Sequence, residues 1–173
     1  MPGTLEKPPV AAGYDEDFYL WTQAQAEVLR EAGRAGVNAA VDWENVAEEI
    51  ESLGKRDREK VGGLTQVILV HLIKLRASPA ADPRKSWKRE VAAARDRVER
   101  ILKNSPSLRA QFASIVEEEW HGALQAAEDD LTEFGEAETA LPDLLALRLR
   151  GPVTAEALEK RYYPEHGDIQ GPP

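Results

Sequence analysis

The chain contains no cysteine and only one methionine among its 173 residues. Without thiols it forms no disulfide, offers no cysteine nucleophile, and builds no zinc finger or iron–sulfur site. Its apolar stretches all fall short of the roughly 18 residues that predict a membrane-spanning helix. The N-terminal sequence lacks a basic segment followed by an apolar one, so we expect no signal peptide and a cytoplasmic protein. Clear alternation of polar and apolar residues is also missing, which favours helices over strands.

Charge is distributed unevenly along the chain. Residues 1–60 carry a net charge of −6, residues 61–110 of +7 and residues 111–173 of −10, within a total of −9. The simpler interpretation is that acidic and basic helices lie side by side and neutralise one another. The alternative is that the basic middle binds a phosphate, a nucleic acid or an acidic partner. A chain this acidic is not expected to coat nucleic acid or an anionic membrane with its whole surface.

In the N-terminal third, apolar residues recur at the three- and four-residue steps of amphipathic helices. The first helix is predicted to begin near Tyr14 and to end before Gly33. Asp42 is the expected N-cap of the second helix, whose buried face includes Val46 and Leu53. Glycines at 54, 62 and 63 mark places where this helix bends, breaks or packs closely against a neighbour.

Residues 64–77 are apolar almost all round. Four β-branched residues between 67 and 73 are compatible with a buried strand. A strand needs a partner strand, and no second candidate is found in the sequence. We therefore predict that 64–77 is a central helix surrounded by the others, with the strand as the alternative.

The C-terminal half also has the pattern of helices. They are expected at 86–104, 105–135, 142–149 and 154–161. Ser86 and Thr154 are the predicted N-caps of two of them, and Ser105 with Pro106 is a strong start signal for the longest. The predicted fold is an all-α, single-domain multi-helix bundle over 14–164. A disordered N-terminal arm, 1–13, precedes it and a flexible C-terminal tail, 165–173, follows it.

The order of five segments along the chain resembles a known family. They are YDEDFYLW at 14–21, VDWENVAEEIESLGKRDRE at 41–59, LVHLIKLRASP at 69–79, SWKREVAAARDRVERILKNSPSLR at 86–109 and PVTAEALEKRYYP at 152–164. The chain is similar to the bacterial family called domain of unknown function 29. The resemblance implies an all-helical fold without an assigned activity, so it transfers no catalytic residue. The family's HLxKW-like segment reads HLIKL here, with Leu75 in the aromatic position.

One hypothesis for a site is a metal or acid–base pocket. Glu118 and His121 share one face of a helix, as in the Glu-x-x-His motif of di-iron proteins, although the motif occurs once here. His71, Glu48 and Glu49 are the candidates to complete a mononuclear iron, manganese or zinc site. Chance spacing in a glutamate-rich helix and a hydrogen-bonded core histidine are the simpler explanations. We therefore predict no cofactor, with a divalent metal as the alternative.

The same glutamates also suggest ion pairs between helices. Glu48, Glu49 and Glu51 are placed to face basic residues of later helices, the candidates being Lys74, Arg89 and Arg95. Such pairs fix the register of a bundle. A general-base role is the alternative, but no nucleophile or oxyanion donor is placed beside them.

A second hypothesis for a site is anion binding at the start of the helix predicted at 86–104. The candidate residues are Arg84, Lys85, Trp87, Lys88 and Arg89. Positive charge at a helix N-terminus is unfavourable, so something should compensate it. An intramolecular acid among Glu117–Glu119 is one answer; a phosphate or nucleic-acid backbone, with Trp87 stacking on a base, is the other.

The four tryptophans are expected to be mainly structural. Trp21, Trp43 and Trp87 lie on predicted buried faces. Trp120 falls off the main apolar stripe of its helix, so it either packs on the terminal segments or marks a protein contact. No glycine-rich phosphate loop, G-x-S-x-G motif or Ser–His–Asp arrangement is present. The leading interpretation is a non-enzymatic protein-interaction module that binds a protein partner or a second copy of itself and does not bind a membrane. Whether the chain is an enzyme stays open.

Overall fold

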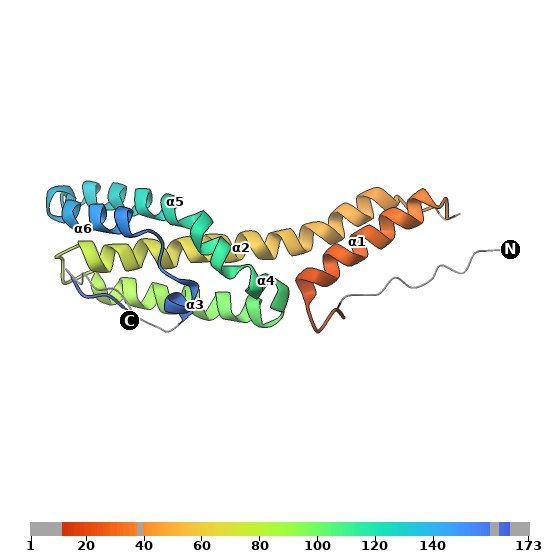
Figure 1. Cartoon of the computed structure of the whole chain (residues 1–173), viewed down its shortest axis with the longest axis horizontal. Coiled ribbons are helices and arrows are strands. Elements are labelled where there is room, and N and C mark those ends of the chain that lie inside the picture. Colours follow the sequence, from red (N-terminus) through yellow and green to blue (C-terminus); the bar gives the residue numbers. More distant parts are fainter. Residues whose placement is uncertain (1–11, 38–39, 160–162, 167–173) are drawn as a thin grey trace. The chain divides into compact units, whose positions relative to one another are not determined.

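The computed structural model describes residues 12–37, 40–159 and 163–166, and every regular element within them is a helix. The predicted all-α fold is therefore confirmed. The helices are α1 (Phe18–Arg34), α2 (Trp43–Ala77), α3 (Arg84–Lys103), α4 (Pro106–Ala110), α5 (Phe112–Glu133), α6 (Ala137–Arg150) and α7 (Ala155–Glu159), as Figure 1 shows. The expected arm, 1–13, and tail, 165–173, lie mainly outside the described residues, as does the end of the last predicted helix at 160–161, so all three stay predictions.

The apolar segment 64–77 is helical, as predicted, and it is the second half of α2. The 35-residue helix continues through all three of its internal glycines, so none of them breaks it. Two of these glycines allow close packing instead. A Cβ at Gly54 would collide with Thr22 Oγ1, and one at Gly62 would lie 2.8 Å from Glu119 Oε1.

The chain divides into two compact units, which are described separately. The first contains residues up to 60 together with 101–110. Here α1 begins at Phe18, later than the expected Tyr14, because Asp17 acts as N-cap and accepts a 3.0 Å hydrogen bond from the Leu20 N–H. The same carboxylate accepts hydrogen bonds from the Ser107 N–H (2.6 Å) and hydroxyl (2.8 Å), which joins α1 to α4.

The helix predicted over 105–135 is divided in two at Gln111. Pro106 does begin a helix, but α4 ends after five residues. The side chain of Ser105 accepts a 3.2 Å hydrogen bond from the Tyr19 N–H, so it serves α1. Leu108 is buried in the first unit, whereas α5 belongs to the second. The break at Gln111 therefore lets each helix bury its own apolar face.

The α1–α2 helix pair has a core of small residues. Ala26 and Ala47 are completely buried, whereas Val46 and Leu53, expected on the buried face, are exposed. Trp43 and Trp21 are half-buried. Close approach at the glycines and alanines explains the difference, because two helices that touch through small side chains leave the larger ones beside the contact uncovered.

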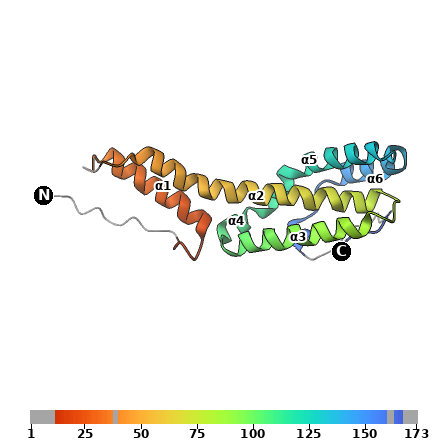
Figure 2. The same cartoon turned by 180° about the vertical axis from the view of Figure 1, so that it is seen from behind.

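The second unit, residues 61–100 and 111–173, holds the larger core. The second half of α2 runs between α3 and α5, and α6 lies beside α5, as both Figure 1 and Figure 2 show. The α3 stripe is buried as predicted, including Trp87, Val91 and Val98. By contrast Phe134, expected at the end of the α5 stripe, is exposed.

Several predicted helix ends in this unit shift. The third helix begins at Arg84 rather than at Ser86, whose hydroxyl hydrogen-bonds Glu90 within the helix. The helix expected at 142–149 begins at Ala137 and includes Pro142, which is exposed, so water can satisfy the carbonyl that its missing N–H leaves free. Thr154 caps α7 as predicted, accepting a 3.2 Å hydrogen bond from the Ala157 N–H.

Candidate functional site

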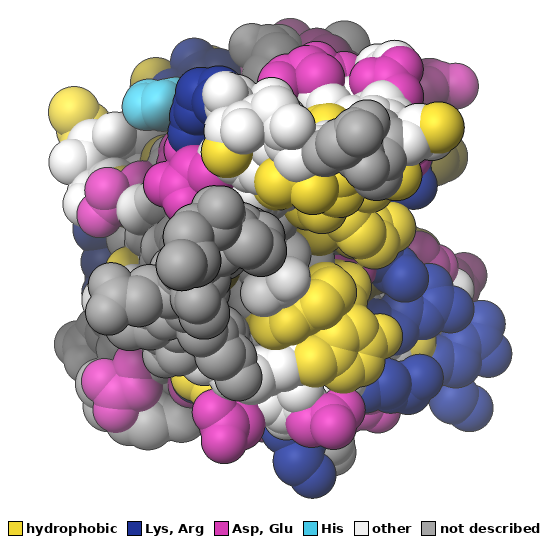
Figure 3. Space-filling view, turned by 90° about the vertical axis from the view of Figure 1, so that its right-hand side faces the viewer, with side chains coloured by type: hydrophobic (Ala, Val, Ile, Leu, Met, Phe, Trp, Pro, Cys, Tyr) yellow, Lys and Arg dark blue, Asp and Glu magenta, His cyan; other side chains and the backbone are white. Residues whose placement is uncertain are grey.

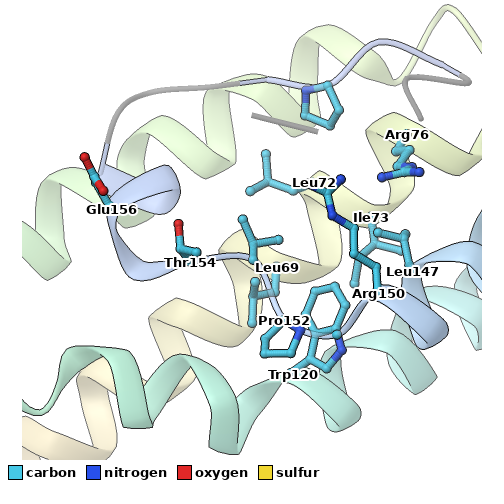
Figure 4. Close-up of a pocket in the computed structure, with 13 residues that line it drawn as sticks. Leu69, Leu72, Ile73, Arg76, Trp120, Leu147, Arg150, Pro152, Thr154 and Glu156 are labelled. Atoms are coloured by element: carbon cyan, nitrogen blue, oxygen red, sulfur yellow. The ribbon is translucent and has the colours of Figure 1, made fainter. Parts of the chain in front are cut away.

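A cavity of about 390 Å³ opens within the second unit, between α2, α5, α6 and the segment that follows α6 (Figure 4). Its walls are mostly apolar. The lining residues are Leu69, Leu72, Ile73 and Arg76 of α2, Trp120 of α5, Leu147 and Arg150 of α6, Gly151–Thr154, Glu156 of α7, and Pro164. Small-molecule sites have this size and this composition, an apolar wall with a few placed polar groups.

Two polar groups in the cavity wall are buried without a hydrogen-bond partner among the described residues. Trp120 is 1% exposed, and its Nε1–H is unpaired. Arg76 is 5% exposed, and its Nε lies 3.6 Å from Asp143 Oδ1. The two groups form an ion pair at this distance but no hydrogen bond, so the Nε–H also lacks a hydrogen-bond partner. Leaving a buried donor unpaired costs about 1–3 kcal/mol. Both groups are donors, so each would be satisfied by an acceptor of its own.

The chain forms this cavity by a turn after α6. Gly151 ends that helix with a φ of 85°, a left-handed conformation that favours glycine. The chain then carries Pro152 and Val153 across the cavity, and Figure 4 shows Pro152 beside the Trp120 ring. This arrangement agrees with the expectation that Trp120 packs on a terminal segment. The sequence did not identify Arg76 and Arg150 as site residues; the available signal was charge placed at the ends of apolar helical runs.

The five residues proposed for a metal or acid–base pocket are not brought together. Glu48 and Glu49 precede His71 in α2 by about six helical turns. Glu48 is exposed, and Glu49 pairs with Arg56 at 3.8 Å. Glu118 accepts a hydrogen bond from the Ser114 hydroxyl, and His121 is exposed. Across the described residues, no group of three or more His, Asp or Glu side chains is placed to hold a metal ion.

His71 is instead a core histidine with one acidic partner. Its Nε2 lies 2.8 Å from Glu90 Oε2, while its buried Nδ1 has no hydrogen-bond partner in the described part of the chain. Burial lowers the pKa of His71 below its usual value, and the charge of Glu90 opposes this only in part. A neutral ring that donates from Nε2 to Glu90 fits this geometry. The simpler explanation given at the sequence level therefore applies to His71.

The ion pairs expected between Glu48, Glu49 or Glu51 and later helices form with other partners. Glu51 accepts a 2.7 Å hydrogen bond from Arg30, which lowers the pKa of that carboxyl group. The Lys74 Nζ lies 2.7 Å from Asp130 Oδ2. The sequence identified residues that form ion pairs but not the pairing, because the charge pattern does not show which helices are neighbours.

The proposed anion-binding residues are largely occupied within the chain. Arg84 lies 3.4 Å and Lys88 3.2 Å from the Glu165 carboxylate, which lowers the pKa of Glu165. The compensating acid is thus Glu165 rather than Glu117–Glu119. Trp87 is buried, with the Lys74 Nζ 4.9 Å from its ring centroid, so its ring is not available to stack on a base. Lys85 and Arg89 are exposed.

Helix α6 has one buried and one exposed apolar face. Ala140, Leu144 and Leu147 are buried. The exposed face carries what we call the α6 leucine row: Leu141, Leu145 and Leu149 are 47%, 48% and 90% exposed. Their four-residue spacing puts them in one line along the helix. Apolar side chains also reach the surface elsewhere, and Figure 3 shows them on one face between acidic and basic groups.

Comparisons with known proteins place the chain in a family. No described helix is long and apolar enough to cross a membrane. No curated protein matches the chain significantly. Among solved structures, an α-helical protein of unknown function from Rhodospirillum rubrum is similar, with 25% sequence identity and a TM-score of 0.71 over 88% of this chain and 92% of that one. The family model described as domain of unknown function DUF29 matches residues 14–158. The chain therefore belongs to the DUF29 family.

Proposed function

We propose that the protein is a non-enzymatic protein-interaction module that binds a second copy of its own chain, α6 against α6. The observation that carries this proposal is the α6 leucine row, Leu141, Leu145 and Leu149. Three aligned leucines at this exposure form an apolar surface that favours burial against a partner. A cytoplasmic location, expected from the sequence, remains a prediction that accompanies the proposal.

Charge on α6 favours a second copy as the partner. The first turn of the helix carries Glu138, and the last turn carries Arg150 and Arg148, the latter paired with Glu128 of α5. Two antiparallel copies therefore place Glu138 of one helix beside the Arg150 end of the other, twice over. An interface between identical chains related by a two-fold axis has this self-complementary property. With Leu145 at the centre, Leu141 of each copy lies opposite Leu149 of the other.

Sedimentation velocity over a range of concentrations tests the proposal. The wild-type chain is expected to dimerise. Leu145→Glu should weaken the dimer roughly thirtyfold, because about 2 kcal/mol of apolar burial is lost when the two half-exposed leucines no longer pack. Leu53→Glu is the matched control, since Leu53 is also exposed but lies on α2. A monomeric wild type, or equal dissociation constants for the two variants, would contradict the proposal.

A further inference from the structure

We propose that the cavity in the second unit binds a small apolar monocarboxylate, a molecule with one carboxylate and a hydrocarbon body. This inference goes beyond the self-association proposed above, because it concerns the buried side of α6 and the groups behind it. It rests on three properties of the cavity: its volume, the chemistry of its walls, and the donors left unpaired in them.

The volume of the cavity and the chemistry of its walls determine the size and the apolar character of the ligand. Leu69, Leu72 and Ile73 form an apolar wall on α2, and Leu147 continues it on α6. Such walls favour hydrocarbon and offer it no hydrogen bond. At about 30 Å³ for each water displaced, a cavity of 390 Å³ holds about 13 non-hydrogen atoms. Decanoate, with ten carbons and two oxygens, is therefore a suitable probe.

The unpaired Arg76 Nε–H determines the head group of the ligand, because it is a donor on a side chain more than nine-tenths buried. The Trp120 Nε1–H is also buried and unpaired, but Figure 4 shows Trp120 at the other end of the cavity from Arg76, so it lies beside the hydrocarbon body and not beside the head group. A carboxylate carries two acceptor oxygens and is the anion that a guanidinium binds best in partly buried surroundings. A neutral alcohol head group has one oxygen and no charge, so it satisfies this site less well.

The other charges around the cavity allow one anion. Arg76 is already close to Asp143, so it supplies less than a full unpaired positive charge. Arg150 adds a second guanidinium, and Figure 4 shows its side chain extending along the cavity. Glu156 lines the far end, on α7. The guanidinium groups of Arg76 and Arg150 favour one carboxylate at their end of the cavity. A dicarboxylate would place its second negative charge near Glu156, which would repel it.

Titration of the full-length protein with decanoate, followed by the indole N–H signals in NMR, tests this proposal. The chain has four tryptophans, and Trp120→Phe identifies the signal of Trp120. We expect that signal to shift in a saturable way, because the hydrocarbon body reaches the Trp120 ring, while the signals of Trp21 and Trp43 stay in place. Decanol, with the same hydrocarbon length and no charge, should bind at least tenfold more weakly.

Two exposed variants separate a charge effect from general damage to the fold. Arg150→Gln removes the guanidinium that reaches the cavity and should weaken decanoate binding at least tenfold. Leu53→Gln, at an exposed position that does not line the cavity, should leave it unchanged, and Leu145→Glu should also leave it unchanged even though it weakens the dimer. An unmoved Trp120 signal, equal binding of decanol and decanoate, or no effect of Arg150→Gln would overturn the proposal.

Discussion

Asp17 provides the sharpest prediction about stability. Its carboxylate is almost completely buried and accepts three hydrogen bonds, one from Leu20 at the start of α1 and two from Ser107 in α4. Asp17→Ala removes all three. Loss of an N-cap costs about 0.5–2 kcal/mol, and a hydrogen bond to a charged group contributes about 1.5–3 kcal/mol. Because the three share one carboxylate, we expect a total loss of about 3–4 kcal/mol.

Asp42 offers a matched control for this prediction. It lies just before α2 and accepts a 3.3 Å hydrogen bond from the Asn45 N–H, but it is exposed and makes no hydrogen bond to another helix within the described residues. Asp42→Ala should therefore cost only the cap, about 1 kcal/mol. Asp17→Asn keeps a good capping residue and loses the charge, so its cost should fall between the two alanine variants.

Urea unfolding monitored by tryptophan fluorescence measures these differences, and hydrogen exchange in α1 shows where they act. Trp21 lies one turn after Asp17, so it reports on the first unit. A loss of about 3–4 kcal/mol is a large part of the stability of an ordinary domain, about 5–15 kcal/mol. If Asp17→Ala costs no more than Asp42→Ala, the carboxylate does not join α1 to α4 and the reasoning is wrong.

Two further predictions concern packing and pH. Gly54→Ala should destabilise the protein by about 1–3 kcal/mol, because the new Cβ meets Thr22 Oγ1. Gly63→Ala in the same helix should stabilise the protein by about 0.5–1 kcal/mol, because a Cβ there meets nothing among the described residues within 4 Å. Thermal unfolding of both variants tests the two predictions. Burial lowers the pKa of His71 in the folded state, so as the pH falls the unfolded state binds the proton first. The free energy of unfolding should therefore decrease as the pH drops below about 6.5, until His71 is protonated in the folded state too. The difference in stability between wild type and His71→Gln, measured from pH 8 to pH 5, should change in that window; a difference independent of pH would refute the assignment.

Local signals in the sequence predicted local structure well. Thr154 caps α7 and residues 64–77 form a helix, because capping chemistry and the lack of a partner strand are properties of the chain itself. Helix ends set by distant partners could not be found in this way. Asp17 starts α1 in the place where it also receives hydrogen bonds from Ser107, ninety residues later. Ser105, which has the pattern of a cap for its own helix, bonds the Tyr19 N–H.

The candidate site was less predictable than the fold. Chemistry that depends on residue type alone suggested His71, His121 and three glutamates, which the structure leaves apart. The cavity instead depends on how Trp120, Arg76 and the segment after α6 meet, and no spacing rule brings them together. Trp120 gave the one available sign, since it lies off the main stripe of α5 and is nevertheless buried. A side chain that breaks a helical stripe can mark a contact with a segment far along the chain.

Because the chain has no cysteine, disulfide cross-linking at a single introduced cysteine measures the α6–α6 contact without interference from other thiols. Leu145 is the centre of the α6 leucine row, so in a two-fold antiparallel dimer it faces its own copy, and Leu145→Cys should form a covalent dimer under mild oxidation. Leu53→Cys, at a position on α2 that is also exposed, should stay monomeric on a reducing-agent-free gel under the same conditions. Rapid cross-linking of the Leu145→Cys variant alone is the predicted result. Equal rates for the two variants, or no cross-link at position 145, would contradict the account.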